Sequence, residues 1–446
     1  MIGIKEKISY GFGDMASSMF WKIFGMYMLY FYTDVFGLAP AAVGTMFLVT
    51  RIWDSINDPI FGVIADRARS RWGKFRPWIL FGAVPFSVLG VLTFLVPPIS
   101  WTPAMRLLYA YVTYTSMMMV YSAVNVPYAS LLGVISPNGH DRNALSSYRM
   151  FFAYAGSFIA LALVEPLVRN FSNLGGIHSE ARGWAMTVGC IGILCTILLL
   201  LCFRGVRERV QPVAEKQSSV HNDLKDLLRN RPWWILLGAG IAALIFNSIR
   251  DGATIYYFKY YVQQDQAAVI GGFFTLSALY LMVGQVSNMV GVALAAPLAD
   301  RFGKKRIYLG AMLTATVLSV VFYSLRPDQL VSIFLLQTLI SICAGSIFPL
   351  LWSMYADIAD YSEWRTGRRA TGLIFSSSSM SQKFGWTLGG ALTGWLLARY
   401  GFQANEVQSA EAIHGIRMML SWLPAVGTVL SIIFIWFYPL DEKTMK

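Results

Sequence analysis

Two aspartates lie one helical turn apart in the stretch RIWDSINDPI, residues 51–60. Side chains at positions i and i+4 of a helix share one face, so Asp54 and Asp58 would present their carboxylates together. Asn57 adds an amide oxygen between them, and the apolar stretches VGTMFLVT and FGVIA flank the group. Hard cations such as Na⁺ take oxygen ligands, and a close pair of carboxylates can exchange a proton. The spacing therefore predicts a cation site inside a membrane-spanning helix.

A structural ion pair is the alternative to a cation site. A carboxylate at the centre of a bilayer costs about 2.5–3.5 kcal/mol on insertion scales, so it normally faces the interior of a helix bundle and has a partner. Arg51 lies three residues before Asp54, and we expect Lys383 at a similar depth in a later segment. A single ion pair with either cation would need only one of the two carboxylates. The pair of aspartates therefore favours a cation site.

The composition predicts an all-α membrane protein that positions these residues. Of the 446 residues, 56% are hydrophobic and 13% are charged, about half of the 25% charged residues typical of a soluble domain. Twelve apolar segments recur along the chain, the last at 410–438. Each has the roughly 20 residues that a helix needs to cross a bilayer. We therefore expect twelve transmembrane helices.

The distribution of positive charge predicts the orientation of these helices. The net charge is +12, which by itself would be compatible with nucleic-acid binding. The lysines and arginines, however, gather in alternate loops, at 66–76, 204–231, 301–306 and 365–369. By the positive-inside rule these loops and both termini are cytoplasmic. Topology thus accounts for the basic surplus, and we expect no nucleic-acid partner.

An internal repeat divides the chain. The loop GVIADRARSRWGKFRP follows the second apolar segment, and VALAAPLADRFGKKRIY contains the loop after the eighth; both hold Ala-Asp-Arg followed by Gly-Lys. This repeat predicts the major facilitator fold, two pseudo-symmetric six-helix bundles related by a parallel repeat. The expected parts are an N-terminal bundle (1–203), a cytoplasmic linker (204–232) and a C-terminal bundle (233–446).

The repeated loops also carry a candidate cytoplasmic gate. Charge-assisted bonds at helix ends can form in one conformational state and break in another. If the loops served only to fix orientation, their positive charge would be explained, but neither the matched aspartate nor the matched glycine would be. The predicted gating residues are Asp66, Arg67, Asp300 and Arg301.

Other ionisable side chains are expected at membrane depth. Lys22 lies near the middle of the first segment, after Asp14 and Ser18. Lys22 and Lys383 lack an obvious partner in their own segments, so we expect partners from other helices, in particular the aspartates of the second segment. Pairing of Lys22 with Asp14 of its own segment is a further option. Long side chains near a membrane edge can reach the interface, and we assign Glu165 and Lys259 to that position.

Arg250 and Asp251 lie in the middle of the seventh segment, in FNSIRDGATIYYF. Contacts with each other or with neighbouring helices would satisfy their charges, and binding of a substrate would do so equally well. The residues themselves do not decide between these two uses.

An enzyme is not expected. The four cysteines and four histidines have no metal-ligand spacing, and no nucleophile–base pair is apparent. We expect no cofactor, no obligate protein partner and no covalent chemistry.

Several motifs together resemble the glycoside–pentoside–hexuronide:cation symporter family, and the resemblance covers essentially the whole chain. They are KISYGFGDMAS, FYTDVFGL, RIWDSINDPIFGVIADRARSRWGKFRPWIL, NVPYASL, ADIADYSEW and MSQKFG. The resemblance implies uptake of a sugar or glycoside through a bacterial inner membrane, driven by Na⁺, Li⁺ or H⁺.

The resemblance also implies roles for individual residues. Asp54 and Asp58 fall on the family's cation-binding aspartates, Ser122 lies beside them, and Lys383 matches a lysine that links the cation site to the sugar site. The predicted cation site consists of Asp54, Asp58, Asn57 and Ser122. Its aspartates form a metal site if the cation is Na⁺, the ion that we favour over H⁺. The predicted substrate-binding residues are Ser18, Lys22, Tyr121, Asn125, Arg149 and Lys383.

Two positions depart from the family pattern, since Ser18 and Asn125 stand where aspartates are expected. Both changes remove negative charge from the expected sugar pocket, and Lys22 adds positive charge nearby. The sugar is therefore left open between a neutral glycoside and one that carries a carboxylate. A lipid or drug carrier of the same fold, and a membrane sensor that does not transport, are the alternatives to a sugar symporter.

Overall fold

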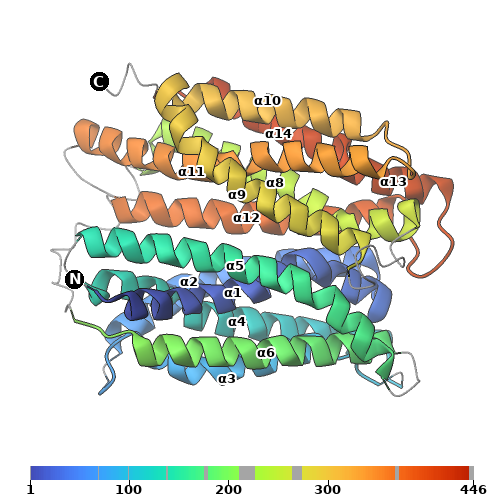
Figure 1. Ribbon diagram of the computed structural model, residues 1–446, viewed down its shortest axis with the longest axis horizontal. Coiled ribbons are helices and arrows are strands. Elements are labelled where there is room, and N and C mark those ends of the chain that lie inside the picture. The colour runs from blue at the N-terminus through green and yellow to red at the C-terminus, as the bar shows by residue number, and fades with distance from the viewer. Residues whose placement is uncertain are drawn as a thin grey trace. The chain divides into compact units, whose positions relative to one another are not determined.

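The computed structural model describes residues 2–68, 70–98, 100–136, 139–174, 179–209, 227–263, 274–366 and 371–440, and this part of the chain is helical, with no β-strand. The chain divides into two compact units (Figure 1). The N-terminal unit comprises residues 1–213 with 268–278, and the C-terminal unit comprises residues 214–267 with 279–446. Much of the expected linker, residues 210–226, lies outside the described residues.

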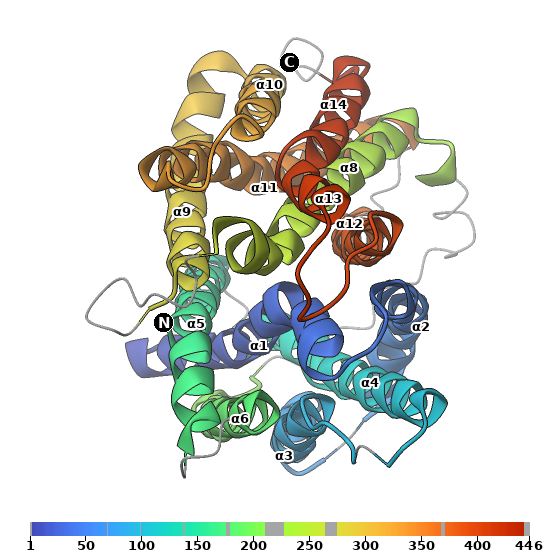
Figure 2. The ribbon, with the colours of Figure 1, turned by 90° about the vertical axis from the view of Figure 1, so that its right-hand side faces the viewer.

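The N-terminal unit is built around its first helix. The helix α1 packs most extensively against α5 and next against α6; α3 packs against α6 and α4, and α2 packs against α4, as Figure 2 shows nearly end-on. The helices are α1 (Ile4–Tyr30), α2 (Pro40–Arg67), α3 (Arg76–Thr93), α4 (Pro103–Ile135), α5 (Gly139–Ser172) and α6 (Glu180–Gly205).

The C-terminal unit repeats this packing order. Its first helix, α8, packs against α12 and α14, while α10 packs against α11 and α14. The helices α1 and α8 also both continue into π-helical turns, η1 (Phe31–Val35) and η3 (Tyr257–Val262). The helices are α8 (Arg231–Tyr256), α9 (Leu276–Phe302), α10 (Lys304–Phe322), α11 (Leu330–Thr366), α12 (Thr371–Arg399), α13 (Ala410–Leu420) and α14 (Trp422–Trp436). The repeat in the sequence is thus also a repeat in packing.

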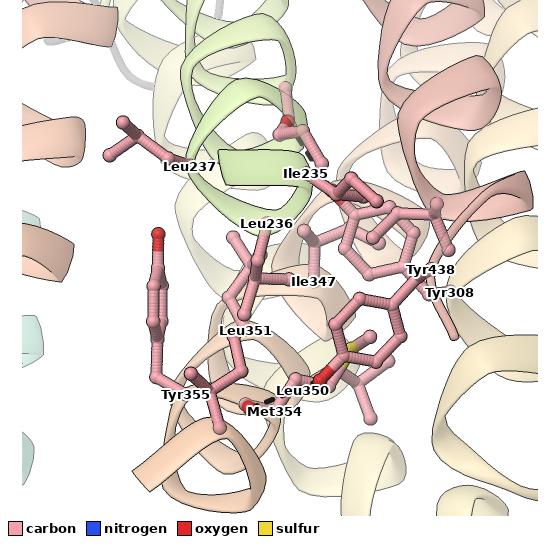
Figure 3. Packing of buried hydrophobic residues seen from close by; sticks show 14 of the residues in the cluster. Ile235, Leu236, Leu237, Tyr308, Ile347, Leu350, Leu351, Met354, Tyr355 and Tyr438 are labelled. Atoms are coloured by element: carbon pink, nitrogen blue, oxygen red, sulfur yellow. Dashed lines mark hydrogen bonds between the residues drawn. The ribbon is translucent and has the colours of Figure 1, made fainter. Parts of the chain in front are cut away.

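Buried aliphatic and tyrosine side chains hold the C-terminal unit together (Figure 3). Leu236 of α8 lies among Ile347, Leu350 and Leu351 of α11 in this cluster. In a lipid environment helices associate mainly through close packing and interhelical hydrogen bonds. Tyr308 and Tyr438 supply both, because the Tyr308 hydroxyl lies 2.8 Å from the Ser431 hydroxyl and the Tyr438 hydroxyl donates to the Met354 carbonyl over 3.3 Å.

Eight helical segments are long and apolar enough to cross a membrane. They are Arg76–Thr93, Tyr148–Ser172, Glu180–Gly205, Arg231–Val262, Leu276–Ala295, Lys304–Phe322, Leu330–Tyr355 and Ala410–Trp436. The other long helices, α1, α2, α4 and α12, are the four that carry the predicted cation- and substrate-binding residues, apart from Arg149 on α5. Polar side chains lower the mean hydropathy of these four helices. The long helices that are not among the eight apolar segments are therefore those with the candidate site.

The glycines of the two repeated loops have the backbone geometry that favours glycine. Gly73 has φ +111° and Gly303 has φ +91°. After Gly73 the backbone N–H groups of Lys74, Phe75 and Arg76 donate to the Glu208 carboxylate over 2.8, 2.8 and 3.0 Å. This carboxylate lies at the N-terminus of α3, where the helix dipole favours an anion. The glycine therefore shapes a loop that anchors the segment after α6.

Arg209, which follows Glu208, anchors the segment after α6 to two other helices, α1 and α4. Arg209 donates to both carboxylate oxygens of Glu6, in the first turn of α1, over 2.7 and 2.8 Å. It also donates to the carbonyl of Ile135, at the C-terminal end of α4, over 3.4 Å. Hydrogen bonding to Glu6 raises the pKa of Arg209 further above its usual value. The cytoplasmic ends expected for α1, α3 and α4 are thus joined through consecutive residues of opposite charge.

The Gly73→Ala variant should be less stable than the wild type. A Cβ at this position would lie 2.6 Å from the Glu208 carboxylate, and a left-handed backbone costs a residue with a side chain about 1–3 kcal/mol. We expect a lower midpoint of thermal unfolding in detergent. Gly189→Ala is the matched control in the same unit, because a Cβ there meets no atom within 4 Å. Equal midpoints for both variants would contradict the role of Gly73.

Candidate cation and substrate site

Asp54 is buried in the N-terminal unit, with 0% of its surface exposed. The Ser122 hydroxyl, on α4, donates to Asp54 Oδ1 over 2.8 Å. Arg51 Nη1 donates to Asp54 Oδ2 over 3.4 Å. The packing of α2 against α4 thus brings together Asp54 and Ser122, which the sequence placed at one site only through the family resemblance.

The next turn of α2 adds two more oxygen-bearing side chains. Asn57 is 4% exposed, and its amide nitrogen has no hydrogen-bond partner among the described residues. A buried polar atom without a partner costs about 1–3 kcal/mol, so a ligand that satisfied this amide would recover free energy. Asp58 is half-buried one turn after Asp54. The amide of Asn57 offers a nitrogen donor and an oxygen acceptor, and the latter suits a cation.

The chemistry of these side chains fits a small hard cation. Carboxylate, hydroxyl and amide oxygens are ligands of hard cations, whereas transition metals favour imidazole and thiolate. Within the described residues, no group of three or more His, Cys, Asp or Glu side chains has the arrangement of a metal site. The Asp54 neighbourhood is therefore suited to Na⁺ or a proton rather than to a transition metal.

An aromatic wall lies beside the Arg51–Asp54 pair. The Arg51 guanidinium is 4.4 Å from the centroid of the Trp21 ring, a cation–π distance. The Trp21 ring centroid lies 5.6 Å from that of Tyr121, and Tyr121 stacks on Phe86 at 6.1 Å. A chain of contacts thus runs from the carboxylate through Arg51 to aromatic faces on α1 and α4.

A second ion pair joins α1 to α5. Arg149 Nε lies 2.8 Å from Asp14 Oδ2, and its guanidinium lies over the Tyr128 ring at 5.3 Å. The Tyr128 hydroxyl donates to the Tyr10 carbonyl over 2.7 Å. We considered Asp14 as a partner for Lys22, and the structure gives Arg149 as the residue that forms an ion pair with Asp14.

The remaining predicted substrate residues occupy half-buried positions. Ser18 and Lys22 lie on α1 and Asn125 lies on α4, where its amide donates to the Tyr121 carbonyl over 3.1 Å. Lys383 is half-buried on α12 of the C-terminal unit. Its expected link to the aspartates stays a prediction.

The gate also stays a prediction. Asp300 and Arg301 are exposed near the C-terminal end of α9. The side chains of Asp66 and Arg67 lie outside the described residues.

Arg250 has partners on neighbouring helices. Its guanidinium donates to Tyr280 Oη over 3.0 Å, to Gln337 Oε1 over 2.9 Å and to the Leu420 carbonyl. Leu420 ends α13, and the chain breaks its helical geometry at Ser421 (φ −127°, ψ −95°) before α14 begins. The expected single segment 410–438 is therefore two helices, and Arg250 satisfies a carbonyl at the break. Of the two uses that the sequence left open, these contacts favour the structural one.

Glu165 has contacts that sequence reasoning missed. We assigned it to a membrane edge, but its carboxylate accepts hydrogen bonds from Tyr27 (3.0 Å), Thr275 and Ser277 (3.1 and 3.2 Å). Thr275 and Ser277 belong to the N-terminal unit and lie at the start of α9. These partners are more than one hundred residues away in the sequence, and no local pattern signals them.

A charged residue buried between membrane-spanning helices is typical of a functional site such as a substrate or ion pathway. The sequence matches the family described as MFS/sugar transport protein over residues 9–442. The chain belongs to this family and is an integral, multi-pass membrane protein.

Individual relatives agree with this assignment. The chain is 36% identical to the "Isoprimeverose transporter" of Lactiplantibacillus pentosus, with 100% of this chain and 91% of that protein covered. It is 35% identical to the "Inner membrane symporter YicJ" of Escherichia coli (strain K12), with 100% and 94% covered. Among solved structures, a D-xylose-proton symporter matches with a TM-score of 0.66 at 15% identity over 99% of both chains. That structural likeness shows the fold alone.

The Asp14–Arg149 pair gives a testable prediction. Asp14→Asn and Arg149→Gln should each destabilise the protein by roughly 1–3 kcal/mol, because each leaves one charge in a half-buried site. This cost lies between those for breaking an exposed and a fully buried ion pair. The double variant should be less destabilised than the sum of the two. Thermal unfolding of all four proteins in detergent checks this. Strictly additive losses would show that the two side chains do not stabilise each other.

Proposed function

We propose that this protein is a symporter that couples the inward movement of a cation to the uptake of a sugar or glycoside by alternating access. The observation that carries the proposal is the buried Asp54, held by Ser122 and Arg51 beside Asn57 and Asp58, in a chain of the sugar transport family. The names of two relatives, an isoprimeverose transporter and an inner membrane symporter, support it.

The proposed architecture has twelve transmembrane helices with both termini in the cytoplasm, in the inner membrane of a bacterium. The N-terminal bundle would cover 1–203, the linker 204–232 and the C-terminal bundle 233–446. The positive loops support this orientation, and the repeated packing order of the two units supports two related bundles.

The proposed mechanism needs no covalent chemistry, because binding alone drives the conformational change. The cation binds the carboxylates of Asp54 and Asp58, with oxygens from Asn57 and Ser122, and reduces the buried negative charge. Lys383 transmits this change to the sugar. The bundles then rock around a central site, with the charged residues at the helix ends as the cytoplasmic gate. The sugar would lie among Ser18, Lys22, Tyr121, Asn125, Arg149 and Lys383.

The proposed coupling ion is Na⁺. Ser122 and Asn57 offer neutral oxygens next to the aspartates; a metal cation takes several oxygen ligands, whereas a proton on a carboxylate needs one acceptor at most. A proton symporter would require only a carboxylate that titrates.

Counterflow in proteoliposomes tests the proposal as a whole. Vesicles loaded with isoprimeverose, xylose or a glucuronide are diluted into the labelled sugar, with Na⁺ present or replaced by choline at fixed pH. We expect counterflow with at least one of these sugars and a higher apparent affinity in Na⁺. A pH response without a Na⁺ response identifies a proton symporter, and no exchange of any glycoside contradicts the assignment of the substrate class.

Asp58→Asn should separate binding from coupling. The variant loses one cation ligand and one titratable group, so we expect concentrative uptake to fall at least about tenfold while exchange down a gradient persists. Uptake and counterflow are compared in the same vesicles, with Asp328→Asn, an exposed aspartate in the loop before α11 and outside every proposed site, as the control for loss of charge. Accumulation by Asp58→Asn with normal cation dependence would remove Asp58 from the coupling site.

Lys22→Gln tests whether the sugar carries a carboxylate. If Lys22 binds an acidic substrate, the variant should weaken competition by a glucuronide selectively, by about tenfold or more, and leave its neutral parent glycoside unchanged, because only the former loses a charge-assisted bond. Competition against the transported sugar measures both. Equal losses for the two sugars together with lost cation dependence would assign Lys22 to the coupling network instead.

A further inference from the structure

Arg51 occupies a position between the candidate cation site and the aromatic wall. It is 9% exposed, and its Nη1 lies 3.4 Å from Asp54 Oδ2, whereas the Ser122 hydroxyl lies 2.8 Å from the other oxygen. Charge-assisted bonds between nitrogen and a carboxylate are usually about 2.7–2.9 Å long. The same guanidinium lies 4.4 Å from the Trp21 ring centroid. Arg51 thus contacts both the carboxylate and the indole, and its bond to the carboxylate is long.

A cation at Asp54 and the Arg51 guanidinium would repel each other. Two like charges a few ångströms apart in a protein interior interact strongly, since the effective dielectric constant is far below that of water. Both depend on the same buried carboxylate for compensation. A bound cation therefore weakens the contact of Arg51 with Asp54, and the contact of Arg51 with Asp54 weakens the binding of a cation.

We propose that Arg51 is a tethered competitor of the coupling cation. It compensates the Asp54 charge while the cation is absent. When the cation displaces Arg51, the packing of the guanidinium on Trp21 changes, and with it the packing of the aromatic wall. The inference rests on the proposed function and deepens it, because it assigns the residue that sets the cation affinity and carries the occupancy of the cation site towards the sugar. Arg51 is a positioning residue in this scheme.

If Arg51 competes with the cation, removal of its charge should strengthen the binding of Na⁺. Arg51→Gln removes the competing charge, so the Na⁺ concentration that gives half of the maximal effect should fall, by roughly tenfold. Arg51→Lys keeps the charge and should stay closer to the wild type. If Arg51 only stabilised the site, Arg51→Gln would weaken the binding of Na⁺ or leave it unchanged.

Two readouts on purified protein measure this without transport. The first is the rise in the midpoint of thermal unfolding with added NaCl against choline chloride, which reports binding to the folded state. Arg51→Gln should reach its full rise at lower Na⁺ and show a larger rise, since Asp54 no longer has the positive charge of Arg51 beside it. The second is tryptophan fluorescence on addition of Na⁺, in wild type and Trp21→Phe. Arg209→Gln, whose guanidinium pairs with Glu6 outside this site, is the control for arginine loss and should keep the Na⁺ affinity of the wild type.

The outcomes separate this inference from the proposed function. A wild type in which neither Na⁺ nor a change of pH alters stability or sugar binding contradicts the coupled symporter itself. A wild type that responds to Na⁺, with Arg51→Gln equal to it or weaker in Na⁺ affinity, overturns the role of Arg51 alone. If Arg51→Gln does not fold, Arg51→Lys and the Trp21 signal decide: a Na⁺-induced fluorescence change that persists unaltered in Trp21→Phe overturns the inference, and its loss supports it.

Discussion

A charge in the hydrocarbon of a bilayer needs compensation from another group, and this requirement determines how the helices of the protein pack. Asp54 on α2 is compensated by Arg51 and by Ser122 of α4. Asp14 on α1 is compensated by Arg149 of α5. Loss of one partner leaves a charge without compensation in a buried or half-buried site, so these contacts fix α2 against α4 and α1 against α5.

The C-terminal unit meets the same requirement in a different way. Arg250 is surrounded by neutral acceptors: a tyrosine hydroxyl, a glutamine oxygen and the carbonyl at the end of α13. These three acceptors bind the guanidinium, and none of them is a carboxylate that could bind another cation in its place. This contact is therefore suited to a fixed structural role, whereas the carboxylate beside Arg51 is suited to exchange.

The sequence alone predicts the helical class, the membrane location and the division by an internal repeat, because hydropathy, charge and repeated loops are local properties. It also places Asp54, Asn57 and Asp58 on one helical face. The contacts of Arg250, Glu165 and Asp14 were out of reach, since their partners Gln337, Thr275 and Arg149 are distant in the chain and belong to ordinary polar residue types. The break at Ser421 does have a local signal that the expectation of one segment overlooked, because Pro424 has no N–H and leaves the Leu420 carbonyl, four residues earlier, without its helical donor.

The low hydropathy of α1 and α2 has a consequence for biosynthesis. The helices α1 and α2 are translated before α4 and α5, and each carries charged residues that cost about 2.5–3.5 kcal/mol at the centre of the bilayer. The groups that compensate Asp54 and Asp14 from other helices, Ser122 and Arg149, are translated later, on α4 and α5. Until those helices arrive, insertion of the first two must rely on the protein-conducting channel or on each other. We therefore expect insertion of α1 to α5 to be cooperative, since a nascent chain that stalls before α5 leaves Asp14 without the contact of Arg149.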